Sequence, residues 1–308
     1  MTFIPAIVTG NVADPHWYWW IVFYFFFGGI AAGAYLIGAM SDLFSRREDG
    51  RENRAVARAA YLLALPLIAL CGILLILDLG KPLRFWHMLV NVSTNQPAFK
   101  YWSPISYGSW VLTGFGLCVA LSAVLAFAEL RGITLLGAHR LGTGLLGKVI
   151  AAIGAVFALF FGSYTGVLLN HTNQRVWGDN TLLGALFMAS AVASGAAALL
   201  LILSLARRRD GAVLERLERT DVIATVVELV LLFALLAVLA AVGRAGALAG
   251  GVLGVLLWLG VVLLGLLVPL GLNLRPRTLG ARTPLVAATL ALIGVFLLRY
   301  VVIFSAHA

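Results

Sequence analysis

Eight long apolar runs constrain the fold of this chain more than any other feature of its sequence. Each has the roughly 20 residues that a helix needs to cross the hydrocarbon core of a bilayer. The runs are residues 17–40, 56–79, 105–128, 148–170, 181–206, 221–243, 248–272 and 284–305. Of the 308 residues, 62% are hydrophobic and only 11% are charged, as expected of a membrane protein. The sequence therefore predicts an all-α integral membrane protein with eight transmembrane helices.

The distribution of basic residues predicts how these helices are oriented. Loops after the first, third, fifth and seventh runs hold 16 Lys and Arg residues, and the opposite side holds five. Because Lys and Arg gather in cytoplasmic loops, both termini are predicted to lie outside, in the periplasm of a bacterial or archaeal cell. The chain would then be a multi-pass protein of the cytoplasmic membrane. The same rule accounts for the net charge of +9 without a nucleic-acid partner.

Aromatic residues are concentrated in the first part of the chain. Of 33 Phe, Trp and Tyr residues, 27 precede Thr181. We therefore expect two four-helix bundles with different roles. Residues 1–180, with helices one to four, would form the ligand-binding bundle, and residues 181–308, with helices five to eight, would form a supporting bundle.

Tyr164 is the candidate centre of a binding site. It lies near the end of an apolar run with Ser163 and Thr165 beside it. Polar side chains at such a position face protein or a cavity rather than lipid, because hydrocarbon offers them no hydrogen bond. Six residues separate Tyr164 from Asn170, which places it about 9 Å below the outer surface at ~1.5 Å per residue.

Three further polar residues are predicted at this depth: His16 before the first helix, Asp78 at the end of the second, and Arg299 in the last. A buried arginine needs a partner, and Asp78 is available. Together with a phenol, these groups suit the binding and deprotonation of a polar headgroup. The structural alternative is that Asp78 and Arg299 form only an ion pair and that Gly162 and Gly166 mark a helix-packing face.

The connection at residues 80–104 predicts a docking surface on the outer side. It combines bases with aromatic rings, a mixture typical of the interface region and of protein contacts. The residues expected to contact a partner are Lys81, Arg84, Phe85, Trp86 and His87.

Acidic residues near the inner half indicate a possible proton path. Asp42 ends the first helix, Asp221 begins the sixth, and Glu228 lies two turns further in. An isolated intramembrane carboxyl is a candidate for proton transfer. The alternative for Glu228 is a neutral glutamic acid that bonds a neighbouring helix.

Several cofactor sites find no match in the sequence. The five histidines all lie in loops or at helix ends, whereas a membrane haem needs axial histidines within facing helices. Cys71 and Cys118 lack the spacing of a cluster or metal site. We therefore expect no haem, no iron–sulfur cluster and no metal site in this chain.

Three short motifs together resemble the NrfD/PsrC family, the polysulfide reductase-like membrane subunits. They are FFFGGIAAGAYL at residues 25–36, DLGKPLRF at residues 78–85 and SYTGVLL at residues 163–169. The eight-helix plan fits the whole chain. Members of that family are haem-free and exchange electrons between a membrane quinone and an iron–sulfur subunit, which in turn serves a molybdopterin or other catalytic subunit.

The resemblance implies a role for Tyr164 as the quinone-contacting tyrosine, and a phenol can donate a hydrogen bond to a quinone carbonyl. The bound substrate would be menaquinone or ubiquinone, and the partner a ferredoxin-like subunit. The polysulfide reductase type also uses an asparagine and a histidine within the first helix. This chain has no such pair there, and Tyr24 is the nearest polar side chain.

Two other functions remain open from the sequence. Glu228, Asp78 and Arg299 could line the path of an ion- or proton-translocating module without quinone chemistry, with Pro66 and Pro269 as candidate helix breaks. Alternatively, the chain could be a membrane anchor without a quinone site. Quinone-dependent electron transfer is expected only of the first function.

Overall fold

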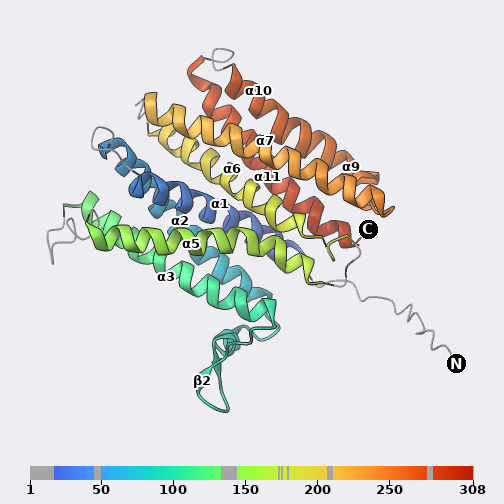
Figure 1. Ribbon diagram of the computed structural model, residues 1–308, viewed down its shortest axis with the longest axis horizontal. Helices are drawn as coiled ribbons and strands as arrows, with labels where there is room; N and C mark the ends of the chain where they lie inside the picture. Colours follow the sequence, from blue (N-terminus) through green and yellow to red (C-terminus); the bar gives the residue numbers. More distant parts are fainter. Residues whose placement is uncertain are drawn as a thin grey trace.

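A computed structural model describes residues 17–44, 50–132, 144–172, 174, 176–178, 180–206, 211–275 and 280–307. Within these ranges it has eight helices that are long and apolar enough to cross a membrane, as predicted (Figure 1). They are α1 (Trp19–Leu43), α2 (Gly50–Asp78), α3 (Pro104–Leu130), α5 (Leu145–Asn170), α6 (Leu182–Leu205), α7 (Gly211–Ala241), a composite span and α11 (Thr283–Phe304). The composite span consists of α9 (Gly251–Val255), the π-helical η3 (Leu256–Leu267) and α10 (Val268–Leu274), preceded by the short α8 (Gly246–Ala249).

Two helices begin earlier than the apolar runs indicate. α2 starts at Gly50 and α7 at Gly211, six and ten residues before residues 56 and 221. Their first turns are rich in Arg, Glu, Ala and Leu, which favour helix in water as well as in lipid. An apolar run reports the part of a helix in hydrocarbon, so it misses turns that extend beyond the membrane.

α1 and α6 lie at the centre of the molecule. α1 packs against α2, α5, α6 and α11, and α6 also packs against α5, α7 and α11. In Figure 1, α3 and α5 lie on one side of this pair and α7, α9, α10 and α11 on the other. The first four helices are thus in broad contact with the last four, through α1 and α5 on one side and α6 on the other.

Glycines allow α1 and α6 to approach each other closely. A Cβ atom on Gly33 would overlap the backbone of Ala191, and one on Gly195 would overlap the backbone of Gly33. Close helix contacts in membranes depend on small residues of this kind, because van der Waals packing stabilises them. Gly166 plays the same role between α5 and α6, where a Cβ would overlap Leu183 and Gly184. The helix-packing role considered for Gly166 is therefore confirmed.

The two ends of the described chain lie together. The ring of Trp19 is 5.5 Å from that of Phe304, and the ring of Tyr18 is 4.8 Å from that of His307, measured between centroids. The start of α1 and the end of α11 therefore share one end of the bundle, as an even number of spans requires.

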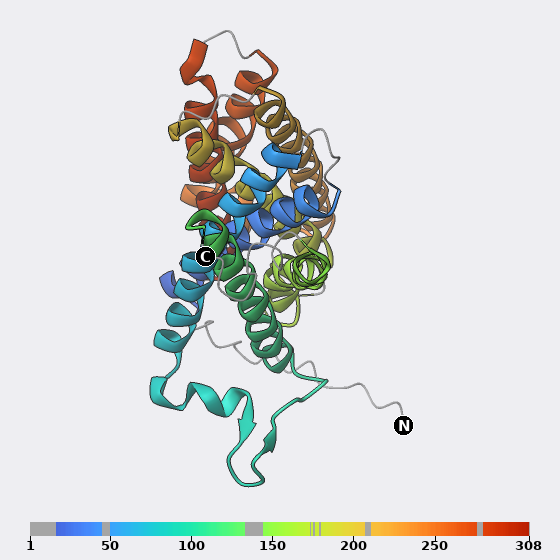
Figure 2. The same cartoon turned by 90° about the vertical axis from the view of Figure 1, so that its left-hand side faces the viewer.

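The connection from α2 to α3 folds as a compact projection beyond the helix ends (Figure 2). It contains the 3₁₀ helix η1 (Pro82–Met88) and the strands β1 (Val90–Asn91) and β2 (Gln96–Pro97), which pair antiparallel with Val90 opposite Pro97. Asn95, in the turn between the strands, has a positive φ of 51°, which asparagine tolerates better than most residues. The hydroxyl of Ser106 on α3 donates to Ala98 O at 3.2 Å, so the projection is tied to the membrane helices.

Candidate functional site

A cavity of about 490 Å³, which we term the inner cavity, lies among the start of α1, the end of α2, the start of α3 and the end of α5. Its walls are mostly apolar and include Ile21, Leu75 and Leu168. Polar groups enter it from four helices: Tyr24 from α1, Asp78 from α2, Ser109 and Thr113 from α3, and Tyr164 from α5. An apolar chamber with a few convergent polar groups is the usual form of a small-molecule site.

Tyr164 forms the wall between this cavity and a second one. The second cavity, of about 540 Å³, lies at the surface between α3 and α5 and is lined by Tyr107, Leu159 and Phe160. The Tyr164 hydroxyl donates to Pro104 O at 2.7 Å, and its ring lies against Gly108. The phenol can therefore be reached from both sides of α3.

Tyr24 is the second hydroxyl of the inner cavity. It is 2% exposed and lines the same cavity as Tyr164. Its ring packs 6.0 Å from that of Phe161, centroid to centroid. The Tyr24 hydroxyl forms no hydrogen bond with any residue in the described part of the chain, so it is available to a ligand. Of the expected site residues, Tyr24, Tyr164 and Asp78 are brought together.

Asp78 lies at the mouth of the inner cavity, where α2 ends. It is half-buried and, among the described residues, has no ion-pair partner. The expected Asp78–Arg299 pair is therefore not formed. His16 lies outside the described residues.

Arg299 belongs to a different cluster from Asp78. The two residues lie at similar depths along their helices, but depth does not show which side of a helix a residue occupies. The guanidinium carbon of Arg299 lies 3.9 Å from the centroid of the Phe187 ring, and Nη2 donates to Phe187 O at 3.3 Å. Glu228 on α7 is the buried acid that acts electrostatically on Arg299, but no ion pair or hydrogen bond joins the two side chains. Arg299 is fully buried and Glu228 is 1% exposed. The packing of α11 against α6 turns Arg299 away from the inner cavity and toward Glu228.

Several polar atoms of this Arg299 cluster are buried without a hydrogen bond inside the described ranges. They are both carboxyl oxygens of Glu228, Nε and Nη1 of Arg299, and the hydroxyl oxygen of Ser190. Asp221, predicted to lie below Glu228, accepts a hydrogen bond from Asn273 Nδ2 at 2.7 Å, while its Oδ1 is unpaired. Buried polar atoms of this kind need water or a titrating proton.

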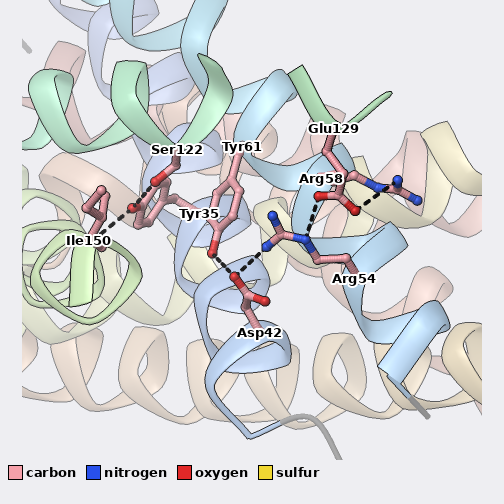
Figure 3. A network of polar contacts seen from close by, with 8 residues as sticks. All are labelled: Tyr35, Asp42, Arg54, Arg58, Tyr61, Ser122, Glu129 and Ile150. Carbon is pink, nitrogen blue, oxygen red and sulfur yellow. Dashed lines mark hydrogen bonds and ion pairs between the residues drawn. The ribbon is translucent and has the colours of Figure 1, made fainter. Parts of the chain in front are cut away.

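Asp42 belongs to a third cluster, which we term the inner cluster, at the ends of α1, α2 and α3 opposite the inner cavity, termed here their inner ends (Figure 3). Arg54 bridges Asp42 at 2.7 Å and Glu129 at 2.8 Å, and Arg58 pairs with Glu129 at 3.3 Å. The Tyr61 hydroxyl donates to Asp42 at 3.4 Å. Asp42 is therefore an ion-pair partner of Arg54 on α2, separate from Asp221 and Glu228 on α7.

The inner cluster continues into the membrane through Tyr35. Its hydroxyl lies 2.8 Å from Ser122 Oγ and donates to Ile150 O at 3.4 Å (Figure 3). Sequence reasoning treated Arg54 and Arg58 only as loop charges and did not single out Tyr35, Ser122 or Glu129. The available signal was the spacing of Arg54 and Arg58, which places both on one face of a helix.

Aromatic rings separate the inner cluster from the inner cavity. The fully buried rings of Phe115 and Phe161 are 5.5 Å apart. Tyr35 packs against Phe115 on one side and Tyr24 against Phe161 on the other. These packed rings therefore form an apolar layer between the inner cavity and the ion pairs of Arg54.

The predicted docking residues lie on and beside η1. Lys81, Arg84, Phe85 and Trp86 are exposed, and the ring of His87 lies 4.1 Å from that of Trp86. Phe85 also lines the inner cavity. The projection is therefore part of the roof of the cavity.

Comparison with known proteins gives concordant matches over nearly the whole chain. Residues 8–308 match the family model described as polysulphide reductase, NrfD. Protein NrfD of Escherichia coli is 27% identical over 94% of each chain. A protein NrfD homolog of Haemophilus influenzae is 28% identical over 90% of each chain. The C subunit of the polysulfide reductase of Wolinella succinogenes is 27% identical over 94% of this chain and 93% of its own length.

Proposed function

This chain belongs to the NrfD family of polysulphide reductase proteins, and from this premise we propose that it is the haem-free, quinone-reactive membrane subunit of a respiratory oxidoreductase. It would act in a bacterial or archaeal cytoplasmic membrane, with both termini outside. One relative is named as the C subunit of a polysulfide reductase, which supports a role as one subunit among several. The catalytic chemistry on the terminal substrate would then take place on another subunit.

The observation that carries this proposal is the inner cavity. Its volume of about 490 Å³ is within the usual range for pockets that bind small molecules and cofactors. Apolar walls suit the ring and tail of menaquinone or ubiquinone, and Tyr24, Tyr164 and Asp78 suit its oxygens. All lining residues precede residue 181. We therefore assign quinone binding to residues 1–180 and support to residues 181–308.

The reaction at this site is a two-electron exchange. Oxidation of a hydroquinone releases two electrons and two protons. The electrons pass to the clusters of an iron–sulfur partner, and the protons leave toward the outside with Asp78 as first acceptor, since a carboxylate at the mouth can exchange with water. In the opposite direction the same groups supply the protons. The chain itself carries neither haem nor cluster in this scheme.

The projection after α2 is the proposed docking site of that partner. Lys81 and Arg84 offer charge, and Phe85, Trp86 and His87 offer rings, which is the composition of many protein interfaces. A ferredoxin-like subunit docked here would lie directly above the cavity that Phe85 lines. It would pass electrons on to a molybdopterin or other catalytic subunit.

We propose that Glu228 and Asp221 form an inner-side proton route coupled to the quinone site. Their unpaired buried carboxyl oxygens support this role. Asp42 is not included, because Arg54 already pairs with it. Glu228→Gln is expected to abolish proton translocation in sealed vesicles while quinone-dependent turnover continues. If neither changes, Glu228 is structural.

The same cluster favours a second candidate function, an ion- or proton-translocating module without quinone chemistry. Glu228, Arg299 and Ser190 would line its path. Such modules use broken helices, and Pro66 and Pro269 are the candidate breaks in this chain. Because α2 continues unbroken through Pro66, only Pro269 remains as a candidate.

Titration of the purified complex with a short-tailed quinol tests the proposed function. Electron transfer to the catalytic subunit should depend on the quinol and saturate. Tyr164→Phe should lower this turnover by roughly tenfold, the effect of one strong hydrogen bond. Reduction of the catalytic subunit by a soluble dye bypasses the membrane and should be unaffected. Absence of any quinol dependence in the wild-type complex would refute the quinone function and leave the translocating module or a simple anchor.

A further inference from the structure

Gly108 on α3 provides the surface on which Tyr164 rests. A Cβ atom at Gly108 would overlap the hydroxyl oxygen, Cζ and Cε1 of Tyr164. Gly108 is buried and itself lines the inner cavity. Any side chain at this position would therefore push the phenol away from α3.

In this position, the hydroxyl hydrogen of Tyr164 is already used in a hydrogen bond to the backbone of α3. The hydroxyl donates to Pro104 O, one turn before Gly108, at 2.7 Å. A phenol has one hydrogen but also lone pairs that accept hydrogen bonds. Toward the inner cavity Tyr164 therefore presents an acceptor, and the expected donation to a quinone carbonyl would require it to leave Pro104 O.

The two hydroxyl groups that α3 contributes to the cavity also use their hydrogens in bonds within the helix. Ser109 donates to Ile105 O at 2.9 Å and Thr113 donates to Ser109 O at 2.7 Å. Asp78 accepts hydrogen bonds when ionised. The Tyr24 hydroxyl and the Trp17 indole can donate, but they serve a quinone and a hydroquinone alike, because hydroquinone oxygens also accept.

We propose that Gly108 is a positioning residue that holds Tyr164 as a hydrogen-bond acceptor, so that the cavity prefers a ligand whose oxygen carries a hydrogen. This inference rests on the proposed quinone site. Within that site it assigns the preference to the hydroquinone over the quinone, because only the hydroquinone can donate to Tyr164 and Asp78.

The helix provides matched controls for a substitution at Gly108. A Cβ at Gly116, also on α3, meets nothing within 4 Å, and one at Gly114 meets the ring of Phe157 at 2.6 Å. Gly116→Ala thus tests the effect of alanine in the helix, and Gly114→Ala tests a clash away from the inner cavity. At Gly108 the displaced ring of Tyr164 has room in the second cavity, of about 540 Å³, so the variant is expected to fold.

The experiment measures the binding of three probes to the complete purified complex: a short-tailed naphthohydroquinone, its dimethyl ether and the matching naphthoquinone. The ether keeps the ring and loses both donor hydrogens. We expect the wild type to bind the hydroquinone about tenfold more tightly than the ether or the quinone. Gly108→Ala should weaken the hydroquinone about tenfold and leave the other two within about twofold. Gly116→Ala and Gly114→Ala should keep the wild-type preference.

Tyr164→Phe provides a second variant that keeps the ring and removes the acceptor. It should lose the same preference, and the double variant with Gly108→Ala should bind no worse than Tyr164→Phe alone, because both act through one hydroxyl. An unchanged preference in Tyr164→Phe, or equal weakening of all three probes in both variants, would overturn the inference. A wild type that binds the probes without preference would overturn it too. A wild type that binds none of them would instead refute the proposed function.

Discussion

Arg299 and Glu228 are both ionisable and both buried within membrane-spanning helices, although no ion pair joins their side chains. The guanidinium stacks on Phe187 at 3.9 Å and donates to the backbone of the same residue. Such stacking suits arginine, whose planar charge is weakly hydrated. Glu228 on α7 is the buried acid that acts electrostatically on Arg299, without a direct hydrogen bond between the two side chains.

We expect Arg299→Met to destabilise the folded protein by roughly 1–3 kcal/mol, because it removes a charge-assisted hydrogen bond to Phe187 O and the buried cation that acts on Glu228. Adding Glu228→Gln should recover part of this loss, because no buried charge then remains. Denaturant unfolding in detergent micelles measures both variants. A double variant that is less stable than Arg299→Met alone would contradict this electrostatic interaction.

At the scale of helices, close crossing and ionic bridging stabilise different parts of the bundle. α1 and α6 touch through Gly33, Gly195 and Ala191, where no side chain intervenes. The inner ends of α1, α2 and α3 are joined by Arg54, which is bound by carboxylates from both neighbours. Packing thus connects the two halves of the molecule, whereas ion pairs connect helices within the first half.

Gly33→Ala should separate α1 from α6. The added methyl group overlaps backbone atoms of Ala191, which cannot move as a side chain could. We expect a loss of about 1–3 kcal/mol in unfolding free energy. Gly72→Ala on α2 is the control, because a Cβ there meets nothing within 4 Å. Equal stability of the two variants in thermal unfolding would refute the close crossing.

Arg54→Met should destabilise the inner ends of the first three helices by about 3 kcal/mol, because it leaves Asp42 and Glu129 largely buried without their main partner. Arg219→Met removes an exposed ion pair with Glu215, whose side chains are both 71% exposed, and should change the stability by no more than about 1 kcal/mol. Unfolding of the two variants at low and high salt measures the contrast. Salt should weaken the effect of Arg219 more than that of Arg54.

At the scale of the whole molecule, the described polar groups divide into an outer and an inner set. The inner cavity, the projection after α2 and both ends of the described chain gather on the outer side of the proposed orientation. The cluster around Arg54 lies at the opposite end, beyond the layer of Phe115 and Phe161. This separation suits a protein that exchanges electrons with a partner at one face of the membrane.

Charge reversal at the projection should weaken assembly with an iron–sulfur partner. Lys81→Glu with Arg84→Glu is expected to lower the affinity of the partner about tenfold or more, mainly through slower association and with strong dependence on salt. Arg219→Glu at the opposite end is the control and should leave assembly intact. Retention of the partner by the double variant, with loss in the Arg219 variant, would reverse the proposed orientation.

The eight helices and the polar character of the segment around Tyr164 could be predicted from the order of residues alone. The physical reason is local: the hydrocarbon core penalises each polar residue wherever its neighbours lie. Tyr164 lies six residues before the end of α5 and lines both cavities. The resemblance of three short motifs identified the family for the same reason, since it depends on residues adjacent in the chain.

Which polar side chains meet depends on how the helices pack in three dimensions. Depth alone placed Arg299 beside Asp78, but the rotation of α11 against α6 turns Arg299 toward Phe187 and Glu228. That rotation depends on packing between residues more than a hundred positions apart, such as Arg299 and Phe187. For the same reason, no spacing in the sequence could show that Gly108, on another helix, holds Tyr164 in place.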